Sequence, residues 1–280
     1  RQQINKDAAM RILPIAAAIA ATLAVAACAT TTSPTGRTQY VGAVSQEQLN
    51  QMGAQAFTEQ KAKMQQTGNA AQKRYVDCVV RAVVAQLPAA QRQIAWESAV
   101  FVDDNPNAFA LPGGKVGVYT GIFTVAKNQD QLAAVIAHEI GHVIANHHDE
   151  RITRQMGAQA GLGVVGALVG SRYGDGATQT TNQLGGAALQ AAFLLPGSRA
   201  QETEADVVGQ RLAAEAGFDP RQAVNLWQNM ITASGGSRPP QWLSTLPDPS
   251  ARIGELQQRA TALVPTWEQA RAAGRRPACG

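Results

Sequence analysis

The sequence predicts a mostly helical α+β fold that contains one small β-sheet. Hydrophobic residues make up 45% of the 280 residues, enough to bury the core of a compact domain. Only 5% are aromatic, whereas alanine, glycine and glutamine are frequent. This composition favours closely packed helices over a sandwich of aromatic-rich strands. Apolar residues recur at helical spacing along most of the chain, and strand-like segments occur near its middle.

The predicted elements follow this patterning in chain order. The first two helices end at Gly68 and Pro88, residues that interrupt a helix, and turn residues around Pro106 separate the first two strands. The expected helices are Ser45–Met64, Ala70–Leu87, one that starts after Asn128 and passes through Ile144, Arg151–Val169, Ser198–Ala216, Asp219–Ala233 and Ser250–Leu263; the expected strands are Ile94–Val102, Ala108–Leu111 and Lys115–Thr120.

The first 28 residues are expected to be a removed signal peptide. Met10 and Arg11 precede the apolar run Ile12–Ala27, which is shorter than the roughly 20 residues of a membrane span. The run ends in small residues before Cys28 and resembles a bacterial lipobox, which implies that Cys28 is acylated. Because Ala29 rather than aspartate follows, the Gram-negative sorting rule implies the outer membrane. An ordinary signal peptide and an uncleaved anchor are the alternatives.

The rest of the chain is divided by composition. Residues 29–44 are predicted to be a tether, residues 45–273 the folded domain and residues 274–280 a C-terminal tail. The formal net charge is only +4, which gives no reason to expect a nucleic-acid partner. The run Gly161–Gly170 is too short to span a bilayer. Close helix packing is one interpretation of it, and a lid or a membrane contact is the other.

Two more cysteines, Cys78 and Cys279, are expected in an oxidising compartment. A disulfide between them would hold the tail to an early helix and contribute about 2 to 5 kcal/mol. Two free thiols are the alternative.

The run His138-Glu139-Ile140-Gly141-His142 carries the clearest chemistry in the chain. Residues four apart on an α-helix share one face, so both imidazoles can reach one tetrahedral Zn²⁺ ion. Glu139 lies about 100° around the helix axis, close enough to take a proton from a water that the ion activates. The alternative is a chance match on a core helix.

A catalytic zinc site needs a third protein ligand. Glu202 and Asp206 lie four apart on one face of a predicted helix, so one can bind the metal while the other accepts the ring N–H of a ligating histidine. Glu204 lies about 200° from Glu202 around the axis and is expected to face solvent. The alternative is a charged outer face on an ordinary helix.

The two remaining histidines follow the motif closely. If the helix continued, His147 and His148 would lie about 140° and 240° around its axis from His142, so neither is expected to bind the same ion. They are predicted to lie at the surface or to support the site.

Three segments together resemble metallopeptidase family 48, a gluzincin group that includes the CAAX prenyl proteases. They are the histidine run at 138–142, residues 107–114 (Asn-Ala-Phe-Ala-Leu-Pro-Gly-Gly) and residues 198–206. The resemblance covers about residues 40 to 262 and is strongest to periplasmic lipoprotein members. It implies a gluzincin-type helical domain with the small sheet beside the zinc helix.

The resemblance also implies roles for individual residues. His138, His142 and Glu202 are expected to bind one Zn²⁺ per chain, with Glu139 as general base and Asp206 supporting a ligand. In gluzincins an edge strand beside the zinc helix pairs with an extended substrate. That role would fall to six consecutive residues, Gly113, Gly114, Lys115, Val116, Gly117 and Val118. A plain hairpin turn before this strand is the alternative.

One position departs from the family pattern. Where the family commonly has histidine before its last helix, this chain has Leu246, and leucine can neither approach the metal nor stabilise an oxyanion. Arg252 and Tyr119 are the remaining candidates for that role, and we expect reduced activity or different gating.

The expected function is zinc-dependent cleavage of unfolded or misassembled cell-envelope proteins. The resemblance and the Cys28 segment imply a Gram-negative periplasmic lipoprotein anchored to the outer membrane, with unfolded polypeptides as substrates and the outer-membrane assembly machinery as a candidate partner. The alternative is a non-catalytic chaperone or assembly factor that uses the same groove. A purely structural zinc site is disfavoured, because only three ligands are found.

Overall fold

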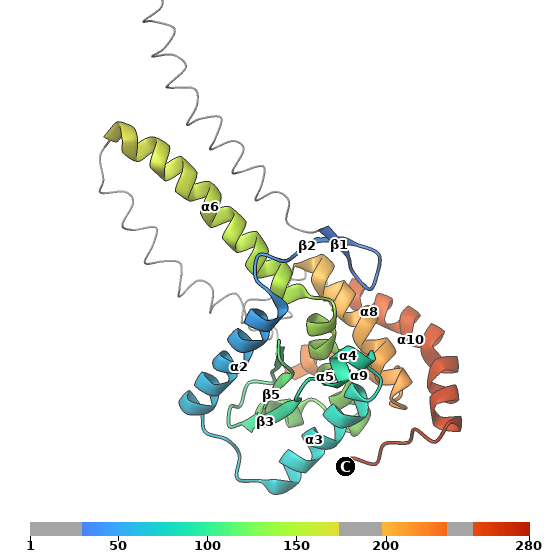
Figure 1. Cartoon of the computed structure of the whole chain (residues 1–280). Helices are drawn as coiled ribbons and strands as arrows, with labels where there is room; N and C mark the ends of the chain where they lie inside the picture. Colours follow the sequence, from blue (N-terminus) through green and yellow to red (C-terminus); the bar gives the residue numbers. More distant parts are fainter. Residues whose placement is uncertain (1–29, 174–197, 234–248) are drawn as a thin grey trace, which may run out of the picture. The chain divides into compact units, whose positions relative to one another are not determined.

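The computed structural model describes residues 30–173, 198–233 and 249–280 (Figure 1). These fall into two compact units. The first holds residues 30–32, 38–45 and 149–173, and the second holds residues 33–37, 46–148, 198–233 and 249–280. None of the helices in the described ranges is long and apolar enough to cross a membrane. The mostly helical α+β fold predicted from the sequence is confirmed.

The first unit consists of a short hairpin and a long helix. Strands β1 (Thr30–Thr32) and β2 (Thr38–Tyr40) pair antiparallel, and α6 (His147–Tyr173) supplies the helix from its third residue onward. Gln39 donates a hydrogen bond to Glu150 over 3.3 Å, and the Gly42 N–H donates to Asp149 over 3.0 Å. Part of the segment predicted to be a tether is therefore folded.

The second unit holds a sheet packed among helices. Its helices are α2 (Gln46–Lys63), α3 (Ala70–Val84), α4 (Ala89–Arg92), the 3₁₀ helix η1 (Thr120–Thr124), α5 (Gln129–Ile144), α8 (Arg199–Glu215), α9 (Gln222–Ala233) and α10 (Pro249–Ala272). Its strands are β3 (Glu97–Phe101), β4 (Ala108–Leu111) and β5 (Lys115–Tyr119). The short helix α4 and the helix η1 were not expected from the sequence.

The order of strands in this sheet is β3-β5-β4. Strand β5 pairs parallel with β3 and antiparallel with β4, so both of its sides are occupied. The expectation that residues 113–118 form a substrate-binding edge is therefore wrong. Gly113 and Gly114 make the turn into β5 with φ of 78° and 73°, and Val116 and Val118 are fully buried. Among the described residues the edge strand that contacts α5 is β4.

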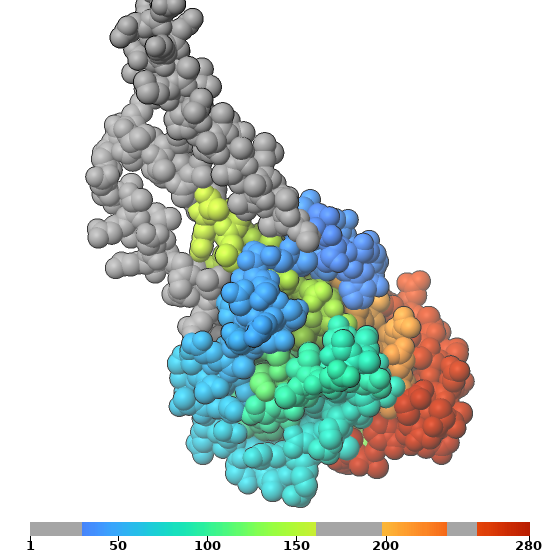
Figure 2. Space-filling view, viewed as in Figure 1, coloured from blue at the N-terminus to red at the C-terminus, as the bar shows by residue number. Residues whose placement is uncertain are grey.

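Helix α5 is the central element of the second unit. Its apolar residues Leu132, Ile136 and Ile140 are fully buried, and it contacts α3, α8, α9 and β4. Asn128 caps its start, since the side-chain oxygen accepts the Gln131 N–H. Figure 2 shows one face of the unit, covered by α2 and α3, with the C-terminal helix α10 along its side.

Two helix ends differ from the predictions. Helix α5 ends at Ile144, because Asn146 has a φ of 54° and the chain turns there before α6 begins. Asparagine tolerates this left-handed conformation better than most residues. At the other end of the chain, α10 continues past Leu263 and contains Pro265.

A disulfide joins Cys78 in α3 to Cys279 in the tail. The tail also meets the start of α5, where the Gln129 side chain donates to the Pro277 carbonyl over 2.9 Å and accepts the Cys279 N–H over 2.8 Å. These contacts attach the last residues to the helix that carries the histidine pair.

Candidate metal centre

Helices α5 and α8 approach each other through glycines. A Cβ added to Gly209 of α8 would lie 2.7 Å from the His138 backbone, and one added to Gly141 of α5 would lie 3.0 Å from the Ala205 carbonyl oxygen. Because no side chain separates the two backbones, the acidic residues of α8 reach the histidines of α5. The capping box at Ser198 and Gln201 fixes where α8 begins and hence which of its residues face α5.

Three donor atoms converge between these helices. His138, His142 and Glu202 are buried, and one ligand atom from each lies within 4.8 Å of the others. The two Nε2 atoms are 3.2 Å apart, His138 Nε2 is 3.4 Å from Glu202 Oε2, and His142 Nε2 is 3.6 Å from Glu202 Oε1.

These separations fit a small tetrahedral cation. Around a tetrahedral ion with bonds of about 2.1 Å, as zinc has, neighbouring ligand atoms lie about 3.4 Å apart. The donor set of two imidazoles and one carboxylate is typical of catalytic sites that keep the fourth position for water or substrate. The three residues can therefore hold a divalent metal ion without rearrangement of the backbone.

His138 is held from behind by a carboxylate. Its Nδ1 lies 2.9 Å from Asp206 Oδ1, and Asp206 accepts two hydrogen bonds of 2.7 Å from Arg252. Burial alone would lower the pKa of His138, but the carboxylates of Asp206 and Glu202 raise it to about 10. The site thus concentrates negative charge, which a divalent cation would neutralise.

His142 is supported by His147, for which the sequence left a surface position and a supporting position open. His142 Nδ1 lies 2.8 Å from Nδ1 of His147, and His147 Nε2 lies 3.1 Å from Glu204 Oε2. His147 is fully buried. With Nε2 of His142 facing the metal site, its Nδ1–H donates to His147, whose Nε2–H donates to Glu204.

The expectation that Glu204 faces solvent is wrong, since it is 2% exposed. Burial alone would raise its pKa, but hydrogen bonds from Ser33, Thr35, His147 and Arg37 lower the pKa to about 2. Glu204 lies on a different side of α8 from Glu202, where the turn at Asn146 brings His147. That turn carries the available sequence signal, because asparagine after a helical run indicates a helix end.

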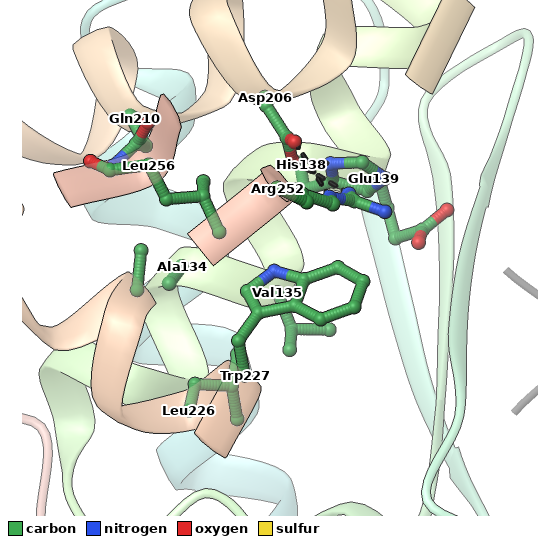
Figure 3. A pocket seen from close by; sticks show the side chains of 11 residues that line it. Ala134, Val135, His138, Glu139, Asp206, Gln210, Leu226, Trp227, Arg252 and Leu256 are labelled. Carbon is green, nitrogen blue, oxygen red and sulfur yellow. Dashed lines mark hydrogen bonds and ion pairs between the residues drawn. The ribbon is translucent and has the colours of Figure 1, made fainter. Parts of the chain in front are cut away.

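Glu139 lies beside His138 at a pocket. Besides these two residues, the lining comprises Ala134, Val135, Asp206, Gln210, Ala223, Leu226, Trp227, Arg252 and Leu256. Figure 3 shows the Glu139 carboxylate pointing away from the Asp206–Arg252 pair, while the Trp227 indole lies among the apolar lining residues. The Arg252 guanidinium carbon is 3.8 Å from the Trp227 ring centroid. The pocket therefore combines a half-buried carboxylate with an apolar wall.

Other candidate residues have different surroundings. Arg252, considered for oxyanion binding, forms an ion pair with Asp206 over 2.7 Å. The Tyr119 hydroxyl accepts a hydrogen bond from Gln60, and its ring packs against Phe101 and Phe109. Cys28 and Leu246 lie outside the described residues. The run Gly161–Gly170, considered above as a lid, lies within α6.

Comparison with known proteins gives consistent matches. The family profile described as Peptidase family M48 matches residues 70–260. The chain is 36% identical over 185 residues to the mitochondrial metalloendopeptidase OMA1 of Schizosaccharomyces pombe, covering 66% of this chain and 52% of that protein. It is 34% identical over 170 residues to the beta-barrel assembly-enhancing protease of Escherichia coli K12, covering 58% of this chain and 34% of that protein. The chain thus spans about half and about a third of their lengths.

Proposed function

Because the chain belongs to peptidase family M48, we propose that it is a zinc-dependent endopeptidase. The observation that carries the proposal is the convergence of His138, His142 and Glu202, whose ligand atoms have tetrahedral separations. A zinc ion held by these residues would supply Lewis acidity, which would activate water near neutral pH and polarise a peptide carbonyl.

Glu139 is the proposed general base. It follows His138 on α5 and lines the pocket beside it, so its carboxylate can take the proton of the attacking water and pass it to the leaving amine. Asp206 keeps the His138 proton on Nδ1 and directs Nε2 toward the metal. No side chain of this set is required as a covalent nucleophile.

The proposed substrate is an extended segment of an unfolded polypeptide. Strand β4 is the edge of the sheet beside α5, and no strand in the described ranges pairs with its other side. A substrate that adds a strand there is bound through its backbone and so with little dependence on sequence. The apolar wall formed by Val135, Leu226 and Trp227 would take one apolar side chain of that segment.

The proposed location is the cell envelope, with a lipid anchor on Cys28. The support is the apolar segment that ends in small residues before this cysteine, together with a relative named for β-barrel assembly. Other relatives are named mitochondrial, so the compartment needs its own test. Labelling with a palmitate analogue should modify the parent chain and not Cys28→Ser, and an unlabelled parent would refute the anchor.

The deciding experiment uses Glu139→Gln in the full chain. We expect the variant to retain one zinc ion while casein cleavage falls at least 1,000-fold, about the upper range of general-base contributions, and o-phenanthroline to abolish cleavage by the parent. Glu255→Gln is the control, since Glu255 is exposed on α10. Parental activity in Glu139→Gln would remove the base assignment.

A parent chain that binds zinc and unfolded protein but cleaves nothing would favour the chaperone or assembly role instead.

A further inference from the structure

A five-residue turn, Ser33–Arg37, lies against the start of α8, and we refer to it as the strap. It connects β1 to β2 and belongs to the same compact unit as α5 and α8. In Figure 1 the loop between β1 and β2 runs alongside the first turns of α8. None of its residues is one of the three metal-ligand candidates, so its contacts with α8 need a separate explanation.

The sequence of the strap encodes a tight turn. The Gly36 N–H donates to the Ser33 carbonyl over 2.9 Å, and the Ser33 N–H donates to the Arg37 carbonyl over 2.8 Å. Pro34 suits the second position of such a turn, and Gly36 has a φ of 88°, which glycine adopts without strain. The Ser33 hydroxyl accepts the Arg37 N–H over 3.1 Å. The turn therefore has one defined shape.

That shape directs two side chains at one buried carboxylate. The Thr35 hydroxyl donates to Glu204 Oε1 over 2.6 Å, and the Thr35 N–H adds a contact of 3.3 Å. Arg37 donates to Glu204 Oε2 from Nε over 3.1 Å and from a terminal nitrogen over 2.9 Å. Hydrogen bonds to an ionised group are among the stronger ones in proteins.

Glu204 continues the connection toward the metal site. Its Oε2 lies 3.1 Å from His147 Nε2, and His147 Nδ1 lies 2.8 Å from His142 Nδ1. Glu204 and His147 are 2% and 0% exposed, so their hydrogen bonds are made with protein groups inside the fold. Because a carboxylate oxygen of Glu204 accepts from His147 Nε2–H, His147 Nδ1 is the acceptor for the Nδ1–H of His142.

The two histidine ligands are thus supported differently. His138 is backed by Asp206 and Arg252, which come from α8 and α10 and are each 4% exposed. His142 is backed through His147 and Glu204 by a turn whose Arg37 side chain is 26% exposed. The support of His142 is the half of the site that depends on a segment outside the helices.

We propose that the strap is a positioning element for the metal ligand His142. Thr35 and Arg37 fix Glu204, Glu204 fixes the His147 tautomer, and His147 aims Nε2 of His142 at the metal. Neither strap residue belongs to the three metal-ligand candidates or to the lining of the pocket. The inference rests on the proposed metal site and adds that the affinity of the site for its ion depends on residues 33–37.

The test measures zinc affinity of the full chain by competition with a fluorescent chelator. Thr35→Val keeps the size of the side chain and removes the 2.6 Å hydrogen bond, and Arg37→Ala removes two more. Each is expected to weaken zinc binding about 10- to 100-fold, the usual effect of losing a group behind a ligand. Arg37→Lys should keep only part of the zinc affinity that Arg37→Ala loses, because lysine lacks the second, fixed donor of arginine. Arg92→Ala, an exposed arginine on α4, is the control.

A second measurement separates positioning from folding. With Co²⁺ in place of zinc, the visible absorption band reports ligand geometry, and it should shift in Thr35→Val while metal-free melting temperatures of variant and parent agree. If Thr35→Val and Arg37→Ala both kept the zinc affinity and the cobalt spectrum of the parent, the positioning role of the strap would be refuted. The proposed function would be unaffected by that result. A parent that binds no zinc would instead overturn the proposed function.

Discussion

The backbones of Gly209 in α8 and His138 in α5 touch without an intervening side chain. A Cβ on Gly209 would lie 2.7 Å from the Cα and N atoms of His138, closer than real Cβ contacts come. The backbone of a helix cannot yield as a flexible side chain can, so the helices would have to separate. Separation would move Glu202 away from the two histidines.

We therefore predict that Gly209→Ala lowers both stability and metal affinity. Overpacking at such a contact costs about 1 to 3 kcal/mol, and zinc binding should weaken at least tenfold, an order of magnitude typical for disturbed ligand support. Urea unfolding of the metal-free chain and chelator competition measure the two effects.

Gly254→Ala in α10 is the matched control, because a Cβ there meets nothing within 4 Å. This substitution should raise stability by about 0.5 to 1 kcal/mol, as alanine is the better helix former. Equal behaviour of the two glycine variants would contradict the close-packing explanation.

The second prediction concerns Asp206→Asn. Burial alone would raise the pKa of Asp206, but Arg252 and His138 hold it well below its usual range. The amide keeps the shape of the side chain and loses the charge, so Arg252 retains no full counter-charge at this position. We expect zinc affinity to fall about 10- to 100-fold and stability to fall by about 3 to 5 kcal/mol, as when a buried ion pair is broken.

Calorimetry with and without zinc measures the changes in stability and in zinc affinity of Asp206→Asn. Asp219→Asn, which loses a pair with the 56% exposed Arg221, should cost less than about 1 kcal/mol. A loss at Asp206 no larger than this would mean that its charge does not support the site.

The sequence could predict the parts of the site that depend on one helix. Spacing of four residues places His138 with His142, and Glu202 with Asp206, whatever the rest of the fold does. Which acid reaches the histidines depends on the contact at Gly209, and His147 depends on the chain turning at Asn146. Neither is encoded in the spacing of apolar residues, so the sequence could not decide whether His147 lies at the surface or supports the site.

The sheet shows the same limit at the level of topology. Strands β4 and β5 were predicted near their observed bounds because local alternation marks them. The order of the strands in the sheet was not predicted, because β3 pairs in parallel with β5 although β4 lies between them in the sequence. Alternation does not encode which strand lies at the edge, and the edge decides where a substrate can bind.

A third prediction concerns the disulfide between Cys78 and Cys279. It closes a loop of 201 residues, and cross-links of this kind contribute about 2 to 5 kcal/mol. Cys279→Ser should lower the melting temperature and loosen the tail from Gln129 without changing zinc stoichiometry, because neither cysteine contacts the metal ligands. Thermal melts before and after reduction check this. A reducing agent should destabilise the parent and leave Cys279→Ser unaffected, and a parent insensitive to reduction would contradict it.

The last prediction locates the substrate on β4. A strand added to an edge uses the N–H groups of alternate residues only, because the intervening ones point away from the sheet. In a series of hydroxamate-capped extended peptides, each methylated at a single backbone nitrogen, inhibition should weaken about tenfold at every second position, as expected for one lost hydrogen bond of about 1.5 kcal/mol. The intervening positions should tolerate the methyl group. If methylation weakened inhibition equally at every position, or at none, the substrate would not be held as a fourth strand beside Ala108–Leu111.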